Sequence, residues 1–335
     1  MRRQEIQAVL DAAGSGPKHH FGQNFMMDES VLAAIMDAAN IGPADIILEV
    51  GPGPGNLTNL LARRAAAVLA VDVDAPLLRA ASGYWSAEKN IRWLCADVLA
   101  GKHRINPVVI HAVNQLAQEH IAPRSGVKLV SNLPYNVASP LVAELLVLQC
   151  LTGQIATTGT LPDFRLERMV FTVQWEVAQR MAATAGTGDY GGLGVLIQLL
   201  ARVEVLRSIA PGCFWPPPKI RSALVRITPD IDLMKKVAHV RWLQIVITRL
   251  FSHRRQNLAN ALRHGFKSLS FPALSAAATD AGYDLRVRAE TLPPDRLRQL
   301  ADALWTMDGV ADSMRQIAGE QENQTPPAES DSCCH

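Results

Sequence analysis

The sequence predicts an α/β fold with a mainly parallel sheet, followed by a small all-helical domain. Three observations support this prediction. Short apolar segments alternate with helical segments from Asp45 onward, a Gly-rich turn joins the first of these strands to a helix, and the alternation stops after Pro229. Strands separated by helices form βαβ units, and such units pair their strands in parallel.

A chain of 335 residues is long enough for two domains. Residues 1–17 are polar and contain Gly and Pro, so we expect a flexible lead there. The α/β domain is expected over residues 18–229 and the helical domain over residues 230–317. Residues 318–335 are polar and include four acidic residues but no Lys or Arg, so we expect a disordered tail.

Apolar segments predict buried strands, and apolar periodicity predicts the helices. The expected strands are 46–50, 68–71, 91–95, 127–130 and 169–173. The expected helices are 56–64, with Asn56 as its N-cap, then 108–120, 238–250, 254–264, 271–282 and 295–306. The segments 100–124 and 151–165 are inserts to which the sequence assigns no role.

The turn after the first strand carries a GxGxG pattern at Gly51, Gly53 and Gly55. Glycines allow a tight turn and let a ligand approach the backbone. Asp72 and Asp97 follow the next two strands. Asp72 could accept hydrogen bonds from a ribose diol, and Asp97 could accept one from an adenine amine. Either acid could instead cap a helix, but a Gly-rich loop followed by two strand-end acids favours a nucleoside pocket.

The fourth strand runs into the tetrapeptide Asn132-Leu133-Pro134-Tyr135. Open α/β sheets place their active sites at this carboxyl edge. The Asn132 side-chain carbonyl and the backbone carbonyl of Leu133 or Pro134 can accept the two N–H bonds of an exocyclic amine. Two such bonds would direct the nitrogen lone pair toward a sulfonium methyl group, and Tyr135 offers a face for stacking a flipped base. The alternative is an Asn-Pro turn beside a core tyrosine.

These segments together resemble the ribosomal RNA adenine dimethyltransferases of the kasugamycin-resistance type. The resemblance covers about residues 18–307, with its motifs in one order. The matching blocks are His20 to Phe25, Glu49 to Gly55, Asn132 to Tyr135, Gln174 with Glu176 and Val177, Pro216 to Lys219 with Ser222, and Phe251 with Arg254, Arg255 and Asn260.

The resemblance implies a class I S-adenosylmethionine-dependent methyltransferase domain, Rossmann-like, with a helical RNA-binding domain. The implied reaction dimethylates two adjacent adenines in the 3′-terminal hairpin of small-subunit (16S) rRNA within an immature subunit, without a metal. The implied cofactor-binding residues are Asn24, Met26, Gly51, Gly53, Asp72, Asp97 and Asn132. The implied RNA-binding residues are Phe171, Lys219, Arg221, Arg254 and Arg255, although Phe171 could equally be a core aromatic.

Three positions depart from the family pattern. Asp72 stands where many relatives have Glu, which shortens the reach but keeps the chemistry. Trp175 and Gln256 stand where Lys is common, so each position loses a charge that could pair with phosphate.

Composition narrows the class of protein further. The net charge is only +2, but residues 241–267 hold six Lys or Arg, two His and no carboxylate. Such a surface binds phosphates, or it is a solvated face balanced by acids elsewhere. No signal peptide or apolar run of about 20 residues is evident, so no membrane partner is expected. The five irregularly spaced cysteines indicate the reduced thiols of a cytoplasmic protein. We also expect the protein to be a monomer.

Two other functions compete with rRNA methylation. A DNA adenine methyltransferase shares the Asn-x-Pro-Tyr chemistry, but more often has a separate recognition domain and proline where this chain has Leu133. A non-catalytic ribosome-assembly or transcription factor could keep the fold, but would be marked by loss of the tetrapeptide or of the strand-end acids. All of these residues are present.

Overall fold

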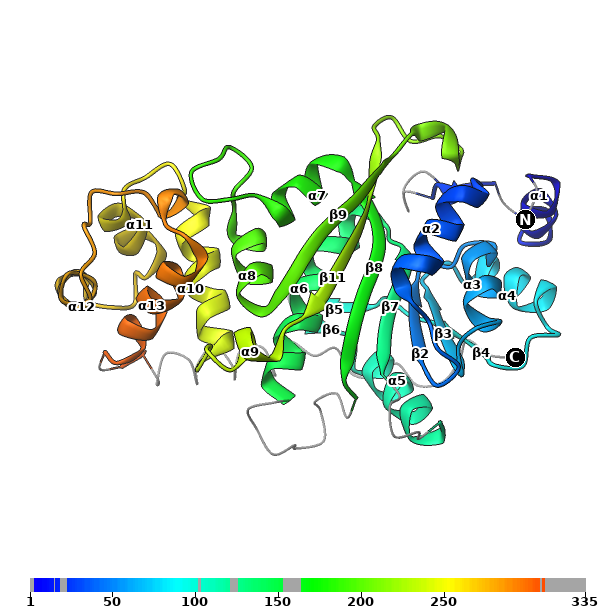
Figure 1. Cartoon of the computed structure of the whole chain (residues 1–335), viewed down its shortest axis with the longest axis horizontal. Helices are drawn as coiled ribbons and strands as arrows, with labels where there is room; N and C mark the ends of the chain where they lie inside the picture. Colours follow the sequence, from blue (N-terminus) through cyan, green and yellow to red (C-terminus); the bar gives the residue numbers. More distant parts are fainter. Residues whose placement is uncertain are drawn as a thin grey trace. The chain divides into compact units, whose positions relative to one another are not determined.

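A computed structural model describes residues 3–14, 16–18, 23–101, 104–120, 126–152, 164–307 and 309–310 (Figure 1). His20–Gly22 of the opening block, much of the 151–165 insert, parts of the 100–124 insert and the expected tail 318–335 lie outside these residues.

Among the described residues, a seven-stranded sheet forms the centre of the α/β part, in the order β4-β3-β2-β7-β8-β11-β9. Its strands are β2 (Ile46–Val50), β3 (Ala67–Asp72), β4 (Ile91–Cys95), β7 (Val127–Asn132), β8 (Leu166–Gln174), β9 (Ala201–Ile209) and β11 (Ser222–Pro229). The five strands β4, β3, β2, β7 and β8 pair in parallel. The mainly parallel sheet expected from the sequence is confirmed.

The edge formed by β11 and β9 is antiparallel, and the sequence analysis did not assign these two strands. In β9, side chains with little exposure alternate with exposed ones along much of the strand, as expected where only one face is covered. β2 and most of β3 are instead buried throughout, because helices cover both faces of the parallel part.

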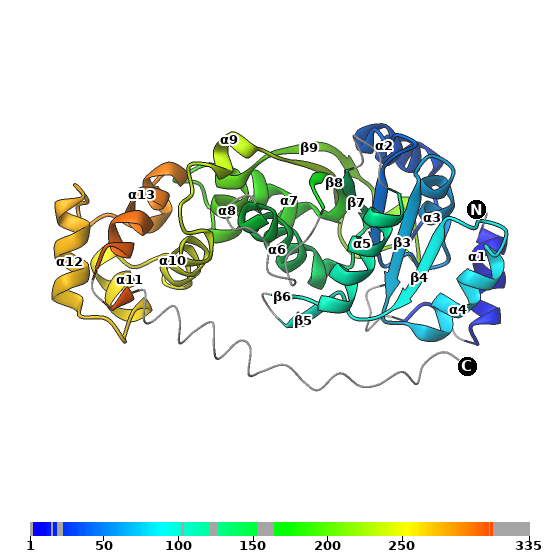
Figure 2. The ribbon, with the colours of Figure 1, turned by 90° about the horizontal axis from the view of Figure 1, so that it is seen from below.

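The helices of this part lie on both faces of the sheet. α2 (Glu29–Ala39) and α3 (Asn56–Ala62) pack on one face, where they share a core cluster with Ile47, Val68 and Val170. α5 (Pro107–Glu119) and α6 (Tyr135–Thr152) lie on the other side (Figure 2). The remaining elements here are α4 (Ala75–Tyr84), α7 (Trp175–Ala182), α8 (Gly192–Leu200), α9 (Ile231–Met234), and the short pairs β1 (Phe25–Met26) with β10 (Phe214–Trp215) and β5 (Leu99–Gly101) with β6 (Arg104–Ile105).

The N-terminal segment is not the flexible lead that its composition predicts. Residues Arg3–Ala12 form helix α1, whose buried side chains are Ile6, Val9 and Leu10. They share a small core with Leu77 and Ala81 of α4. The spacing i, i+3, i+4 of these three apolar residues is an amphipathic-helix signal, which the overall polarity of the segment concealed.

Helix α6 begins at Tyr135, the last residue of the tetrapeptide. Its 18 residues have the length and mean hydropathy (1.3) of a helix that could cross a membrane, although the sequence analysis found no apolar run of that kind. However, 56% of α6 is buried inside the protein, which suits the core helix of a globular domain equally well.

The chain divides into two compact units. The first contains the sheet and continues through α9 to Lys236, and the second begins at Val237 and takes in Ala185–Thr187. The boundary lies seven residues later than the one expected after 229, because α9 packs on α8 and β9. The second unit contains α10 (Val240–Ser252), α11 (Leu258–Gly265), α12 (Phe271–Asp280) and α13 (Pro294–Trp305).

Candidate active site

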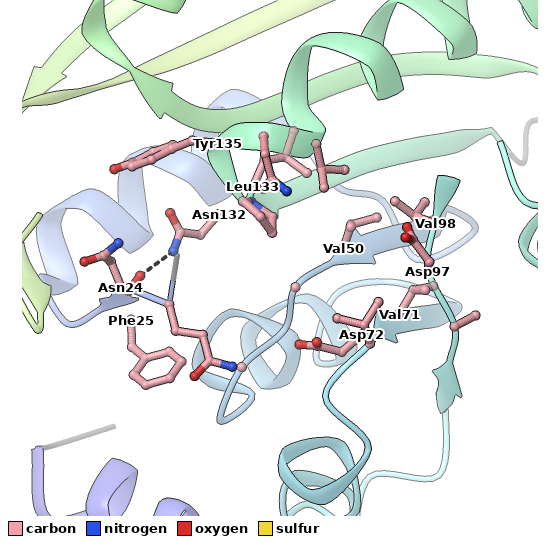
Figure 3. A pocket seen from close by; sticks show the side chains of 18 residues that line it. Asn24, Phe25, Val50, Val71, Asp72, Asp97, Val98, Asn132, Leu133 and Tyr135 are labelled. Carbon is pink, nitrogen blue, oxygen red and sulfur yellow. Dashed lines mark hydrogen bonds between the residues drawn. The ribbon is translucent and has the colours of Figure 1, made fainter. Parts of the chain in front are cut away.

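A cavity of about 420 Å³ opens at the carboxyl ends of the parallel strands (Figure 3). The strand order reverses at β2, because β3 pairs on one side of it and β7 on the other. Ligands of open α/β sheets bind at this kind of switch point, and the volume suits a small organic ligand. Eighteen residues line the cavity, and they include Asn24, Gly51, Gly53, Asp72, Asp97 and the whole tetrapeptide 132–135.

The Gly-rich loop forms one wall of the cavity. Gly51 and Gly53 both have positive φ, at 73° and 55°. A Cβ atom on Gly53 would lie 2.8 Å from the Phe25 ring, and one on Gly51 would lie 3.1 Å from the Pro134 ring. Both positions therefore require glycine for backbone conformation and for space. The loop ends at Gly55, which is the N-cap of α3; Asn56, expected as the cap, is already helical and donates to the Met26 carbonyl at 2.9 Å.

The two strand-end acids both line the cavity, and neither caps a helix. The N-cap of α4 is Asp74, and that of α5 is Asn106. Asp72 accepts a hydrogen bond from the Asp74 backbone N–H, while Asp97 accepts one from the Leu99 N–H. The helix-cap alternative is therefore wrong for both acids. Burial raises the pKa of Asp72, although backbone N–H groups stabilise its charged form.

Asp74 is a residue whose role the sequence analysis missed. It is almost completely buried and accepts hydrogen bonds from Lys18 Nζ at 2.8 Å and from Gln23 Nε2 at 2.9 Å. Burial acts to raise its pKa, but these bonds and the Leu77 N–H outweigh it, so that the pKa lies below its usual value. Asp74 thus ties the segment before Asn24 to the cofactor side of the cavity. The only sequence signal was an acid just before a helix with proline in its first turn.

The Asn132 side chain is held from two sides. Its Nδ2 donates to the Asn24 backbone carbonyl at 2.8 Å (Figure 3). Its Oδ1 accepts from the Thr172 hydroxyl. Thr172 lies in the neighbouring strand β8, in register with Asn132, and is fully buried. A carbonyl oxygen has two lone pairs, so one remains for a ligand N–H. The sequence analysis did not identify Thr172, because the pairing of β7 with β8 brings it to Asn132.

The structure distinguishes between the two backbone carbonyls that the sequence left open. The Pro134 carbonyl accepts hydrogen bonds from the N–H groups of Val137 and Ala138 in the first turn of α6. Within the described part of the chain, the Leu133 carbonyl accepts none. The Leu133 carbonyl is therefore the acceptor that can act together with Asn132 Oδ1.

Tyr135 lies at the rim of the same cavity, as the labelled side chain in Figure 3 shows. Its hydroxyl lies 2.9 Å from Ser222 Oγ at the start of β11. Burial raises the pKa of Tyr135, with the Ser222 contact opposing, so the phenol stays neutral. Because Tyr135 has a hydrogen-bonded hydroxyl and partly exposed atoms at a cavity rim, the core-tyrosine alternative does not fit.

Two expected site residues lie elsewhere. Phe171 is fully buried in β8, so the expectation that it offers a second stacking face is wrong, and the core alternative holds. Met26 does not line the cavity; its side chain is 4% exposed and packs in the core beside α2 and α3. Both errors arise because alternate residues of a strand point to opposite faces, which a motif alone does not specify.

The expected RNA-side residues fall in both units. Lys219 and Arg221 precede β11 and are exposed. Arg254 and Arg255 lie between α10 and α11, where Arg255 is exposed and Arg254 forms an ion pair with Glu290 at 2.9 Å. Part of the basic segment is thus balanced by an acid, as the solvated-face alternative assumed.

Glu49, at the end of β2, is a buried carboxyl directly behind the Gly-rich loop. Its side chain is 1% exposed, and its Oε2 has no hydrogen-bond partner in the described structure. Burial, with a smaller contribution from the charge of Asp72, raises the pKa of Glu49 to about 8. Ionising a buried acid is costly, so burial favours the neutral form of Glu49, and the Thr58 side chain opposes this shift.

The sheet order, the switch-point cavity and the strand-end acids define a class I methyltransferase fold with its active site at the carboxyl edge of the sheet. The model of the ribosomal RNA adenine dimethylase family matches residues 15–281. The chain belongs to this family and is an rRNA adenine dimethyltransferase.

Relatives in the sequence comparison span nearly the whole chain. The chain is 32% identical to a probable ribosomal RNA small subunit methyltransferase A of Methanopyrus kandleri, over 91% of this chain and 98% of the relative. It is 34% identical to ribosomal RNA small subunit methyltransferase A of Pseudomonas savastanoi pv. phaseolicola, over 86% and 94% of the respective chains.

Solved structures support the fold. A dimethyladenosine transferase from Plasmodium falciparum superposes with a TM-score of 0.59 at 19% identity, covering 82% of this chain and 95% of the other. A 23S rRNA methyltransferase superposes with a TM-score of 0.53 at 24% identity, covering 84% and 99%. The competing functions, a DNA methyltransferase and a non-catalytic factor, are not favoured by any of these relatives.

Proposed function

We propose that this enzyme uses S-adenosylmethionine to dimethylate the exocyclic amines of two adjacent adenines in the 3′-terminal hairpin of small-subunit rRNA. The observation that carries the proposal is the pair of acceptors at the cavity, Asn132 Oδ1 and the Leu133 carbonyl, beside a loop that only glycine can form. The substrate proposal is supported by the relatives, which are named for methylation of small-subunit rRNA.

The residues lining the cavity fit S-adenosylmethionine, which supplies an electrophilic methyl group when bound. Asp72 is placed to accept hydrogen bonds from a ribose diol, and Asp97 from an adenine amine. Close approach at Gly51 and Gly53 leaves room for the amino-acid part.

The chain's own groups then act on the target adenine. In the first transfer, Asn132 Oδ1 and the Leu133 carbonyl accept its two N–H bonds and hold the nitrogen in line with the methyl group. The monomethylated amine keeps one N–H for one of these acceptors in the second transfer, and each transfer releases one proton from the nitrogen to solvent. Tyr135 stacks on the extruded base, and no group in this arrangement needs to be a strong base. Catalysis in this scheme rests on positioning and on the two fixed acceptors.

We further propose that the partner is the rRNA within an immature subunit, that the enzyme works as a cytoplasmic monomer, and that it needs no metal. The second unit would act as a helical RNA-binding domain, with Arg255 as one of its phosphate contacts. Arg255 supports this role because it is exposed within the Arg-rich segment 241–267, which has no carboxylate.

The test uses methyl-labelled S-adenosylmethionine with undermethylated small ribosomal subunits, followed by digestion of the RNA to nucleosides. We expect label in dimethyladenosine with the wild type and none with Asn132→Ala. Circular dichroism and cofactor binding serve as controls for the fold of the variant. Large subunits and duplex DNA are control substrates, and label confined to either of them would rule out the proposal.

A further inference from the structure

Trp175 and Arg221 lie side by side where β8 and β11 meet at the active-site edge of the sheet. Gln174 and Ser222 are register partners in these two strands, and the next residue outward on each is Trp175 and Arg221. The Trp175 backbone N–H donates to the Arg221 carbonyl at 3.1 Å. The Arg221 guanidinium lies 4.3 Å from the centre of the Trp175 ring, so the ring holds the cation against one face.

This pair adjoins the rim of the catalytic cavity. Ser222, the residue after Arg221, contacts the Tyr135 hydroxyl at 2.9 Å, and Tyr135 lines the cavity. A nucleic-acid strand that presents a base to Tyr135 therefore has its neighbouring nucleotides close to Trp175 and Arg221.

Arg221 carries a charge that the described protein does not neutralise. It is exposed, and within the described ranges no carboxylate lies within ion-pair distance of it. Two arginines farther along β9 and β11 are paired: Arg226 with Glu204 and Arg202 with Asp230. An aromatic ring orders a guanidinium without cancelling its charge, so Arg221 remains able to pair with a phosphate in two-point geometry.

We propose that Arg221 binds a backbone phosphate of the RNA strand next to the target adenine, with Trp175 as the residue that positions it. The inference rests on the proposed function and adds a contact to it. The indole ring of Trp175 fixes where the charge of Arg221 lies.

The experiment measures binding of undermethylated small ribosomal subunits as a function of salt, together with cofactor affinity. We expect Arg221→Gln to weaken RNA binding about tenfold and to reduce the salt slope by about 0.7, the value for one single-strand phosphate contact. Trp175→Ala keeps the charge, so we expect a loss of about two- to fivefold with an unchanged slope. The double variant should bind no more weakly than Arg221→Gln alone, because the ring acts through Arg221.

Arg202→Gln is the matched control. Arg202 pairs in register with Thr228, six residues along β11 from Ser222, and its side chain is 79% exposed. The Arg202→Gln variant should have the RNA affinity and the salt slope of the wild type. If the wild type binds and methylates undermethylated small subunits but Arg221→Gln has the wild-type affinity and slope, the inference is overturned and the proposed function stands. If the wild type neither binds nor methylates these subunits, both are overturned.

Discussion

At the scale of single residues, the Asn132 amide is held in one orientation. Asn24 receives its N–H, and Thr172 donates to its oxygen, so the amide cannot flip without losing both bonds. Both Asn132 and Leu133 line the cavity. Thr172 is a positioning residue in this arrangement, because it acts through Asn132.

The first prediction concerns this bond. Thr172→Val keeps the shape and the β-branching but removes the hydroxyl, so Asn132 should sample unproductive rotamers. We expect kcat to fall about tenfold, the worth of one hydrogen bond, with KM for the RNA and cofactor affinity unchanged. Thr172→Ser should restore kcat. A rise in KM with unchanged kcat, or failure of the Ser variant to recover, would show that Thr172 has only a structural role.

At the scale of elements, α1 shows how composition can conceal a helix. Gly14, Gly16 and Pro17 and the surrounding polar residues suggested a flexible segment, yet Ile6, Val9 and Leu10 form an apolar stripe. The stripe becomes a stable element only because α4 offers Leu77 and Ala81 as a partner surface. A helix of 10 residues is marginal alone, so tertiary packing decides whether it forms.

We therefore predict that Leu10→Ala lowers the free energy of unfolding by about 2–4 kcal/mol. Leu10 is 1% exposed, so the truncation leaves a cavity between α1 and α4. Gln7→Ala, on the exposed side of the same helix, is the control and should change stability by less than about 0.5 kcal/mol. Urea denaturation measures both variants, and equal stabilities would show that α1 is not part of the folded core.

At the scale of the whole molecule, the cavity lies in the first unit, and the basic segment 241–267 lies in the second, helical unit. Several cations of that unit have internal roles: Arg254 pairs with Glu290, Arg249 lies over Phe266, and Arg263 lies over Phe271. Arg255 is exposed and is the better test of RNA binding by this unit. Substituting Arg254 would also break an ion pair inside the unit.

We predict that Arg255→Glu weakens binding of small-subunit rRNA at moderate salt while cofactor affinity is unchanged, because the cavity lies in the other unit. Arg286→Gln is the matched control, since Arg286 is exposed in the same unit but forms an ion pair with Asp284. Filter binding over a salt series measures both. RNA affinity of Arg255→Glu equal to that of the control would support the solvated-face interpretation.

The sequence by itself determined the βα order, the glycines of the cofactor loop, the two strand-end acids and the tetrapeptide. These features are local, since a turn, a strand end or an N–H acceptor depends on a few neighbouring residues. Tertiary structure alone decided which side chains meet across the sheet. Strand pairing brought Thr172 to Asn132 and Trp175 to Arg221, and it buried Phe171. Helix packing ordered α1, and Asp74 fixed the segment before Asn24. Contacts between residues far apart in the chain depend on register and packing, which no single segment specifies.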